Sequence, residues 1–292
     1  MKKIFSILML LSLVVVSACR KSDNATMPDG IVYLNQPHIT KVSGSPAILD
    51  NDPMAFEATI GIDLYFKESD KKPDYLDFVV MKNGDAKNVK KLRGNITSYP
   101  DEFEVSGQLL TELFGEIVAG DNYDFGVNYI TGSATYLAFP EVGDGYGANV
   151  GTQPDASPTA RYSAICAYEA DEFLGDGKFE VITDGWADFG VGTVVDVVKV
   201  DESTIEITYP ITDFEPIRLN IDLGDNTVEV PRQELGSYDD PDWPYGMLFV
   251  ASTGGGNANY VNPCDGRIRI NGSYTVSAGG FGAFVLELKK VQ

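Results

Sequence analysis

The sequence predicts an all-β protein with two domains, and three observations support this. Apolar residues alternate with polar ones in short runs, which is the period of a half-buried strand. Turn-forming residues separate the runs, since the 292 residues include 30 Gly and 15 Pro. Only one short segment has helical periodicity. A chain of this length suits two domains or one large all-β domain, and a composition shift near residue 155 favours two.

The first predicted domain covers residues 37–150. Residues 55–66 alternate apolar and polar side chains, which predicts a strand. Residues 75–92 hold two runs joined at Asn83-Gly84, a strong hairpin signal. Residues 122–131 and 134–139 predict a further strand and its partner. Several strands with one short helix are typical of a β-sandwich.

One helix is expected at residues 107–117. Leu109, Leu110, Leu113 and Phe114 fall on one face of such a helix, and Gly115 lies close to its end.

The sequence then changes character. Residues 141–160 contain Gly and Pro, few apolar side chains and no periodicity. Such a stretch predicts a linker or an exposed loop. We therefore place the second domain at residues 160–292.

The second domain is predicted to be an antiparallel β-sandwich or barrel. Tight connections are expected at Asp201-Glu202 and at Asp225-Asn226, and no convincing helix is visible. The expected strands are residues 178–183, 193–200, 203–209, 216–222, 226–230, 245–252, 267–270, 272–277 and 281–290.

The amino-terminal segment is typical of an exported protein. Lys2 and Lys3 precede an apolar run over residues 4–16, which is shorter than the roughly 20 residues of a membrane-spanning helix. The run ends in Val16-Ser17-Ala18-Cys19, which resembles the lipobox of bacterial lipoproteins. That resemblance implies a signal peptide at 1–18, removed before Cys19, and acyl chains on Cys19, palmitate among them. Ordinary secretion is the alternative.

Residues 19–36 are interpreted as a tether. More than one acyl chain is needed for stable anchoring, and a triacylated Cys19 would meet that need. No Asp follows Cys19 directly, so the segment lacks the enterobacterial inner-membrane retention signal and suits an outer-membrane lipoprotein. We expect the cell surface, while a periplasmic position stays open.

Charge and chemistry exclude several functions. The chain has 22 Lys and Arg against 43 Asp and Glu, a net charge of −21, and nucleic-acid binding requires clustered positive charge. The single histidine, His38, has no Ser elbow or Cys motif to serve. No sequence pattern identifies two of the acids as the catalytic carboxylate pair of a glycosidase. We therefore predict a non-enzyme without cofactors.

Two glycine-rich stretches do not match a nucleotide site. Residues 252–259 lack the Lys-Ser/Thr of a phosphate loop, and residues 278–284 lead into an apolar strand rather than a helix. β-Bulges and close backbone packing are the better explanation.

Two further cysteines, Cys166 and Cys264, lie in the second half of the chain. Outside the cytoplasm they can form a disulfide. Two buried, unpaired cysteines remain the alternative at this point.

Aromatic residues give the best candidate for a ligand site. Trp186 and Trp243 both lie in loop-like segments among acids, and Tyr245 follows the second one. Sugars pack their apolar faces on flat rings and need polar groups nearby, for which Asp240 is a candidate. Packing against the core is the alternative for either tryptophan. The loop with Asp239, Asp240 and Asp242 also suits calcium loosely, yet its spacing matches no EF-hand, and we predict no metal site.

Three segments of the second half carry a family resemblance: residues 175–189, 226–239 and 270–290. They resemble the C-terminal β domain of accessory lipoproteins of Bacteroidetes, and the N-terminal half resembles the immunoglobulin-like domain that precedes it. Such proteins occupy the SusE/SusF position beside SusC/SusD-type uptake systems. The resemblance implies an outer-membrane, glycan-binding accessory protein whose partners are a polysaccharide and a SusC/SusD-type complex. A structural or adhesive lipoprotein that docks to a transporter or pilus is the rival.

Overall fold

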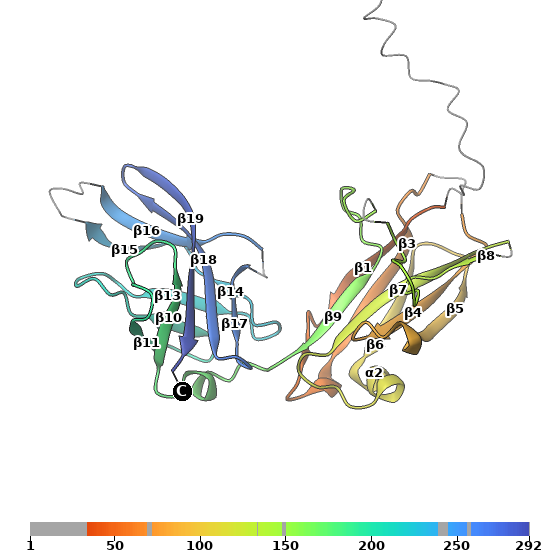
Figure 1. Cartoon of the computed structure of the whole chain (residues 1–292), viewed down its shortest axis with the longest axis horizontal. Helices are drawn as coiled ribbons and strands as arrows, with labels where there is room; N and C mark the ends of the chain where they lie inside the picture. The colour runs from red at the N-terminus through yellow and green to blue at the C-terminus, as the bar shows by residue number, and fades with distance from the viewer. Residues whose placement is uncertain are drawn as a thin grey trace, which may run out of the picture. The chain divides into compact units, whose positions relative to one another are not determined.

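The computed structural model describes residues 34–68, 72–132, 134–147, 150–238, 245–255 and 258–291. Cys19, the signal peptide and residues 19–33 of the tether lie outside these ranges, as do Trp243 and Asp240. The described chain is almost entirely β, so the predicted fold class is confirmed (Figure 1). Among the described residues, no helix has the length and apolarity to cross a membrane.

The first domain is an immunoglobulin-like sandwich of two sheets. One sheet has the order β1-β3-β6 and the other β2-β9-β7-β4-β5, with β8 beside β7. β2 runs parallel to β9, whereas the other pairs are antiparallel. The elements are β1 (Pro37–Gly44), β2 (Ile48–Leu49), η1 (Pro53–Ala55), β3 (Glu57–Leu64), β4 (Tyr75–Lys82), η2 (Ala86–Asn88), β5 (Lys90–Ile96), β6 (Asp101–Ser106), α2 (Gly107–Phe114), β7 (Asn122–Thr131), β8 (Ala134–Tyr136) and β9 (Ala160–Ile165).

Local sequence explains these elements. In β3 the predicted alternation directs Ile60 and Ile62 into the core, where both are fully buried. Ser106 begins α2, because its side-chain oxygen accepts a hydrogen bond from the Leu109 N–H at 3.2 Å. The helix ends before Gly115, whose φ of 82° a glycine adopts without strain.

The stretch predicted as a linker or an exposed loop leads back into the first domain. Ser157 pairs with β1, since its carbonyl accepts from the Ile39 N–H at 2.6 Å. β9 follows and pairs with β7, with Tyr123 opposite Tyr162. The predicted domain start at residue 160 is therefore too early, because β9 buries Tyr162 in the first sandwich. The polar composition of 141–160 belongs to a loop that returns to its own domain.

The second domain is an antiparallel meander whose last strand returns to its first. The order is β14-β13-β12-β11-β10-β19-β18-β16-β15 in one 10-stranded sheet, with β17 beside β18 (Figure 1). Its elements are α3 (Ala170–Leu174), β10 (Lys178–Asp184), β11 (Val194–Lys199), β12 (Thr204–Ile207), β13 (Ile217–Ile221), β14 (Val228–Glu229), β15 (Gln233–Tyr238), β16 (Gly246–Ser252), β17 (Tyr260–Asn262), β18 (Arg267–Val276) and β19 (Gly279–Lys290).

The two edges of this sheet approach each other, so the sheet forms a nearly closed barrel. The Glu215 N–H donates to the Leu235 carbonyl at 2.6 Å. The Gln233 side chain forms the two hydrogen bonds that a neighbouring strand would otherwise form. Its Oε1 accepts a hydrogen bond from the Arg218 N–H and its Nε2 donates one to the Arg218 carbonyl, both at 2.9 Å. The interior is filled by apolar side chains such as Phe179 and Leu288, both fully buried.

Four features of this domain differ from the sequence prediction. β18 is continuous, although a break was expected at Asn271-Gly272. Gly272 pairs with Phe284 within the strand, and the position favours glycine because a Cβ there would meet the Tyr274 ring at 3.0 Å. The short helix α3 and strand β15 were not expected, and neither was the short strand β17.

Cys166 and Cys264 are joined by a disulfide, with their Cα atoms 5.6 Å apart. Cys166 directly follows β9, and Cys264 lies in the turn between β17 and β18. The bridge therefore fastens the first residue after the sandwich to the barrel. On the chain-entropy model, closing a loop of this size stabilises the fold by up to about 4–5 kcal/mol.

Candidate functional site

Every second connection of an antiparallel meander lies at the same end of the barrel. We call one end the mouth and define it by residues 185–193, 208–216 and 277–278 together with Tyr238 and Tyr245 at the adjoining ends of β15 and β16. The other end holds α3, the disulfide and the C-terminus (Figure 1). Barrel mouths are common ligand sites, because loops there can vary on a rigid frame.

Aromatic rings gather at the mouth. The Trp186 ring stacks on the Tyr274 ring, with centroids 4.8 Å apart and planes 4° from parallel. Phe284 meets the edge of Trp186 at 5.3 Å, and Phe281 meets it at 5.7 Å. Tyr245 packs on Phe281 from the other side, also at 5.7 Å. Tyr274 is buried, while Phe281 is 47 % exposed, so Phe281 is the ring of this group that most reaches solvent.

A β-bulge turns Phe281 toward the mouth. Tyr274 pairs with Gly282 and Thr275 with Gly280, so Phe281 is an extra residue on β19. Bulges of this kind redirect side chains. The expectation of bulges in the glycine-rich stretch 278–284 is therefore confirmed, and the bulge explains how Phe281 reaches Trp186.

A carboxylate with three donors adjoins Trp186. Oδ2 of Asp188 accepts hydrogen bonds from Trp186 Nε1 at 3.1 Å and from the hydroxyls of Tyr209 and Tyr238. Trp186 Nε1 also donates to the Tyr238 hydroxyl oxygen at 3.0 Å. Oδ1 of Asp188 takes no hydrogen bond from the described residues. Oδ2 thus accepts the three hydrogen bonds, and Oδ1 can accept a hydrogen bond from a ligand.

The phenols around Asp188 stay protonated at neutral pH. Burial, followed by the hydrogen bond to Asp188, raises the pKa of Tyr238 to about 12. The same two causes raise the pKa of Tyr209 further above its usual range. Burial also raises the pKa of Tyr274. These hydroxyls are therefore donors at physiological pH, as the geometry requires.

The loop that carries Trp186 and Asp188 is fixed by its own hydrogen bonds. Oδ1 of Asp184 accepts from the Ala187 N–H, and Oδ2 accepts from the N–H groups of Phe189 and Gly190, all at 2.8 Å. Ala187 has a φ of 75°, which is uncommon outside glycine. The carboxylate of Asp184 offsets the cost of that conformation and presets the loop.

The structure brings together some of the residues predicted from sequence. Trp186 and Tyr245 both contact Phe281, although they are far apart in the chain. Trp186 is half-buried and packs against the core. Its ring therefore has a structural role in addition to lining the mouth. Trp243 and Asp240 lie in residues 239–244, outside the described part of the chain. Phe281 and Asp188 were missed, although the stretch AGGFGAF carried a signal for the former.

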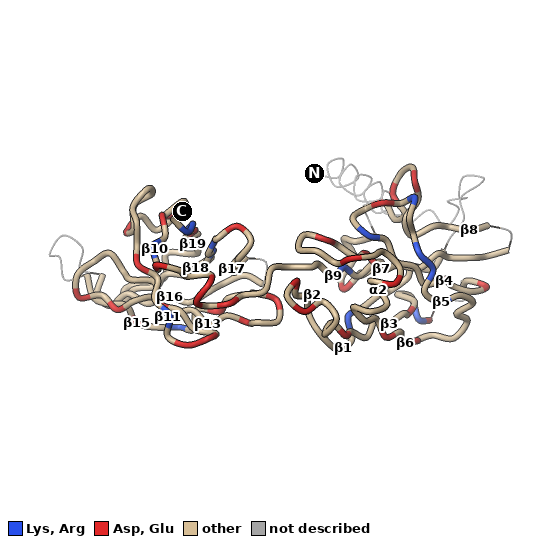
Figure 2. Tube along the Cα trace, turned by 90° about the horizontal axis from the view of Figure 1, so that it is seen from below, with Lys and Arg blue, Asp and Glu red and all other residues tan. Residues whose placement is uncertain are grey.

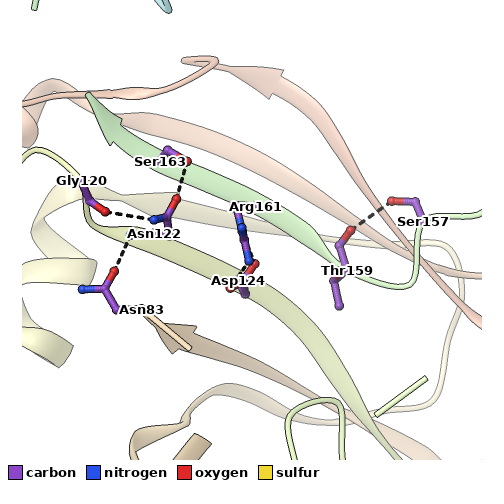
Figure 3. Close-up of polar contacts among 8 residues, drawn as sticks. All are labelled: Asn83, Gly120, Asn122, Asp124, Ser157, Thr159, Arg161 and Ser163. Carbon is purple, nitrogen blue, oxygen red and sulfur yellow. Dashed lines mark hydrogen bonds and ion pairs between the residues drawn. The ribbon is translucent and has the colours of Figure 1, made fainter. Parts of the chain in front are cut away.

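A polar ladder on the first domain has a structural explanation (Figure 3). Arg161 on β9 forms a bidentate pair with Asp124 on β7, with distances of 2.7 and 3.0 Å. Ser163 donates to the Asn122 side chain at 2.6 Å. These contacts hold neighbouring strands together, and each donor has its acceptor.

Within the described ranges, no group of three or more His, Cys, Asp or Glu is arranged to hold a metal ion. His38 lies on β1 of the first domain beside Tyr65. No protein-family model matches this chain, and no curated protein matches it at a significant level.

Proposed function

We propose that this chain is a lipid-anchored outer-membrane binding protein that holds a glycan at the mouth of its second domain. The observation that carries the proposal is the contact of Phe281 with both Trp186 and Tyr245, together with the hydrogen bond from Trp186 to the Asp188 carboxylate. Flat rings beside a hydrogen-bond acceptor suit a sugar, which has apolar C–H faces and hydroxyl donors.

The mouth meets two physical requirements of such a site. Phe281 offers ring surface that is 47 % exposed, so packing a sugar on it removes apolar area from water. Asp184 fixes the Trp186 loop before any ligand arrives. A preset site spends less of the binding free energy on ordering its own side chains.

The anchor and the setting come from the sequence. The leader, Cys19 and the polar tether support attachment to the outer membrane, with the domains on the cell surface. By resemblance, the chain serves as an accessory to a SusC/SusD-type uptake complex. The rival function is docking or adhesion without sugar.

Affinity gels that contain candidate polysaccharides test the glycan proposal. We expect Phe281→Ala to migrate faster than the unsubstituted chain in the gel that retards it. The matched control is Phe66→Ala, because Phe66 is also 47 % exposed but belongs to the first domain. Equal retention of all three forms across a broad polysaccharide panel would favour docking or adhesion.

The anchor is tested separately. Cys19→Ala should lose incorporation of a fatty-acid analogue in cells and leave an unprocessed or soluble form. Equal labelling of the substituted and unsubstituted chains would refute lipidation at Cys19.

A further inference from the structure

The charged side chains described at the mouth are all acidic. Its connections, with Asp184 at the end of β10, hold four described acids and no base: Asp184, Asp188, Asp213 and Glu215. Asp213 and Glu215 are exposed, and they flank Phe214, which packs on Tyr209 and Tyr238. Asp213 and Glu215 therefore adjoin in sequence a ring that packs on two tyrosines of the mouth, and Asp188 bonds Trp186 directly.

The bases of the second domain lie elsewhere. They are Lys178, Lys199, Arg218, Arg232, Arg267, Arg269, Lys289 and Lys290, which lie on strands or just before β15 (Figure 2). Arg218, the base nearest in sequence to the 208–216 connection, is paired with Glu206 at 2.8 and 3.0 Å. Lys290 binds the Glu172 carbonyl at the opposite end of the barrel. No described base is therefore placed to neutralise an anionic ligand at the mouth.

Aromatic rings and carboxylates together favour one kind of ligand. A cation is attracted to the face of Trp, Tyr or Phe and gains more where carboxylates are near. An anion would meet repulsion from the mouth and from the net charge of −21. A neutral sugar gains from the rings but not from the exposed acids.

From this complementarity we infer that the mouth selects saccharides that carry protonated amino groups over neutral and anionic ones. An ammonium group can bind between an aromatic face and Oδ1 of Asp188, which takes no hydrogen bond from the residues that the structure describes, with Glu215 and Asp213 attracting it on approach. This inference rests on the proposed function and narrows its ligand class.

Three oligosaccharides of equal length test the inference at mildly acidic pH: oligomers of glucosamine, of N-acetylglucosamine and of galacturonic acid. They carry ammonium, neutral and carboxylate groups respectively. The mature chain with Trp243→Phe keeps Trp186 as its one tryptophan, since the chain has two. Ligand-induced change in Trp186 fluorescence then reports on the mouth. Calorimetry on the unsubstituted chain gives the same ranking independently of that substitution.

We expect the glucosamine oligomer to bind at least about fivefold more tightly than its acetylated counterpart, and the galacturonic acid oligomer to bind most weakly. Raising the salt from about 0.05 to 0.5 M should reduce both preferences, because screening weakens the attraction of the ammonium groups and the repulsion of the carboxylates alike. Glu215→Gln should weaken glucosamine-oligomer binding about two- to fivefold, as expected for one exposed charge. Glu229→Gln is the matched control, because Glu229 is also exposed but lies on β14, away from the mouth.

The inference is wrong if the neutral or anionic oligomer binds as tightly as the cationic one, or if Glu215→Gln and Glu229→Gln behave alike. Its failure is separable from that of the proposed function. A chain that binds neutral glycans through Phe281 would keep the proposed function while overturning the charge preference.

Discussion

Removing the Asp188 carboxylate should lower the free energy of unfolding more than removing any exposed acid of the mouth. Asp188→Ala deletes the shared acceptor of Trp186, Tyr209 and Tyr238. Tyr209 is only 4 % exposed, so water cannot easily replace the lost bond. Trp186 keeps a second acceptor in the Tyr238 hydroxyl.

The magnitude follows from these contacts. A hydrogen bond to a charged group contributes about 1.5–3 kcal/mol, and a buried donor without an acceptor costs about 1–3 kcal/mol. With one donor partly compensated, we expect Asp188→Ala to lower the free energy of unfolding by about 3–4 kcal/mol. Asp188→Asn keeps a neutral acceptor, so its loss should be about 1–2 kcal/mol.

Urea denaturation followed by tryptophan fluorescence and far-ultraviolet circular dichroism measures both changes. Asp213→Asn is the matched control for Asp188→Asn, because Asp213 is an exposed acid of the same mouth, and it should shift stability by less than about 0.5 kcal/mol. A loss below about 1 kcal/mol for Asp188→Ala would show that the three donors do not depend on this carboxylate.

Three further predictions concern the barrel and its tyrosines. Gln233→Met should lower stability by about 1–2 kcal/mol in urea denaturation, because both Arg218 main-chain groups lose their partner; an unchanged midpoint would mean that water replaces the side chain. Gly236→Ala should cost about 1–3 kcal/mol by the same assay, since its Cβ would lie 2.7 Å from the Phe214 ring, whereas Gly280→Ala, with its nearest neighbour at 3.7 Å, should cost clearly less. Burial raises the pKa of Tyr99 and of Tyr238 from 10.0 to about 12, so below pH 10 both states keep these protons, and between about pH 10 and 12 the unfolded state loses them first and stability falls. Absorbance at about 295 nm should therefore show folded-state phenols ionising late, and ionisation of every phenol near 10 in the folded protein would contradict this.

The sequence predicted the fold class and most strands, because alternation is set by which side chains face the core. β3 and the hairpin at Asn83-Gly84 follow directly from such local signals. The domain boundary did not follow, because the pairing of β9 with β7 is a long-range contact that composition does not encode. The prediction split β18 because a glycine within a strand is locally ambiguous, and the Tyr274 ring and a Val250 methyl group, which leave little room for a side chain, explain the glycine.

The site was partly visible in the sequence. Loop-like surroundings singled out Trp186 and Tyr245, and the structure brings both to Phe281. Asp188 was one acid among 43. What distinguishes it is the convergence of three donors from β10–β11, β12–β13 and β15, which depends on barrel closure and leaves no local pattern.

In the meander, the disulfide and the chain ends of the second domain lie at one end of the barrel, and the loops of the mouth lie at the other. Entry through Cys166 and the C-terminus at β19 both lie opposite the mouth. Insertions or exchanges in residues 185–193 or 208–216 would therefore leave the disulfide and the chain ends untouched. The domain is suited to diversification, and a library built in these two loops, immobilised through a C-terminal tag, would present its variable end to solution.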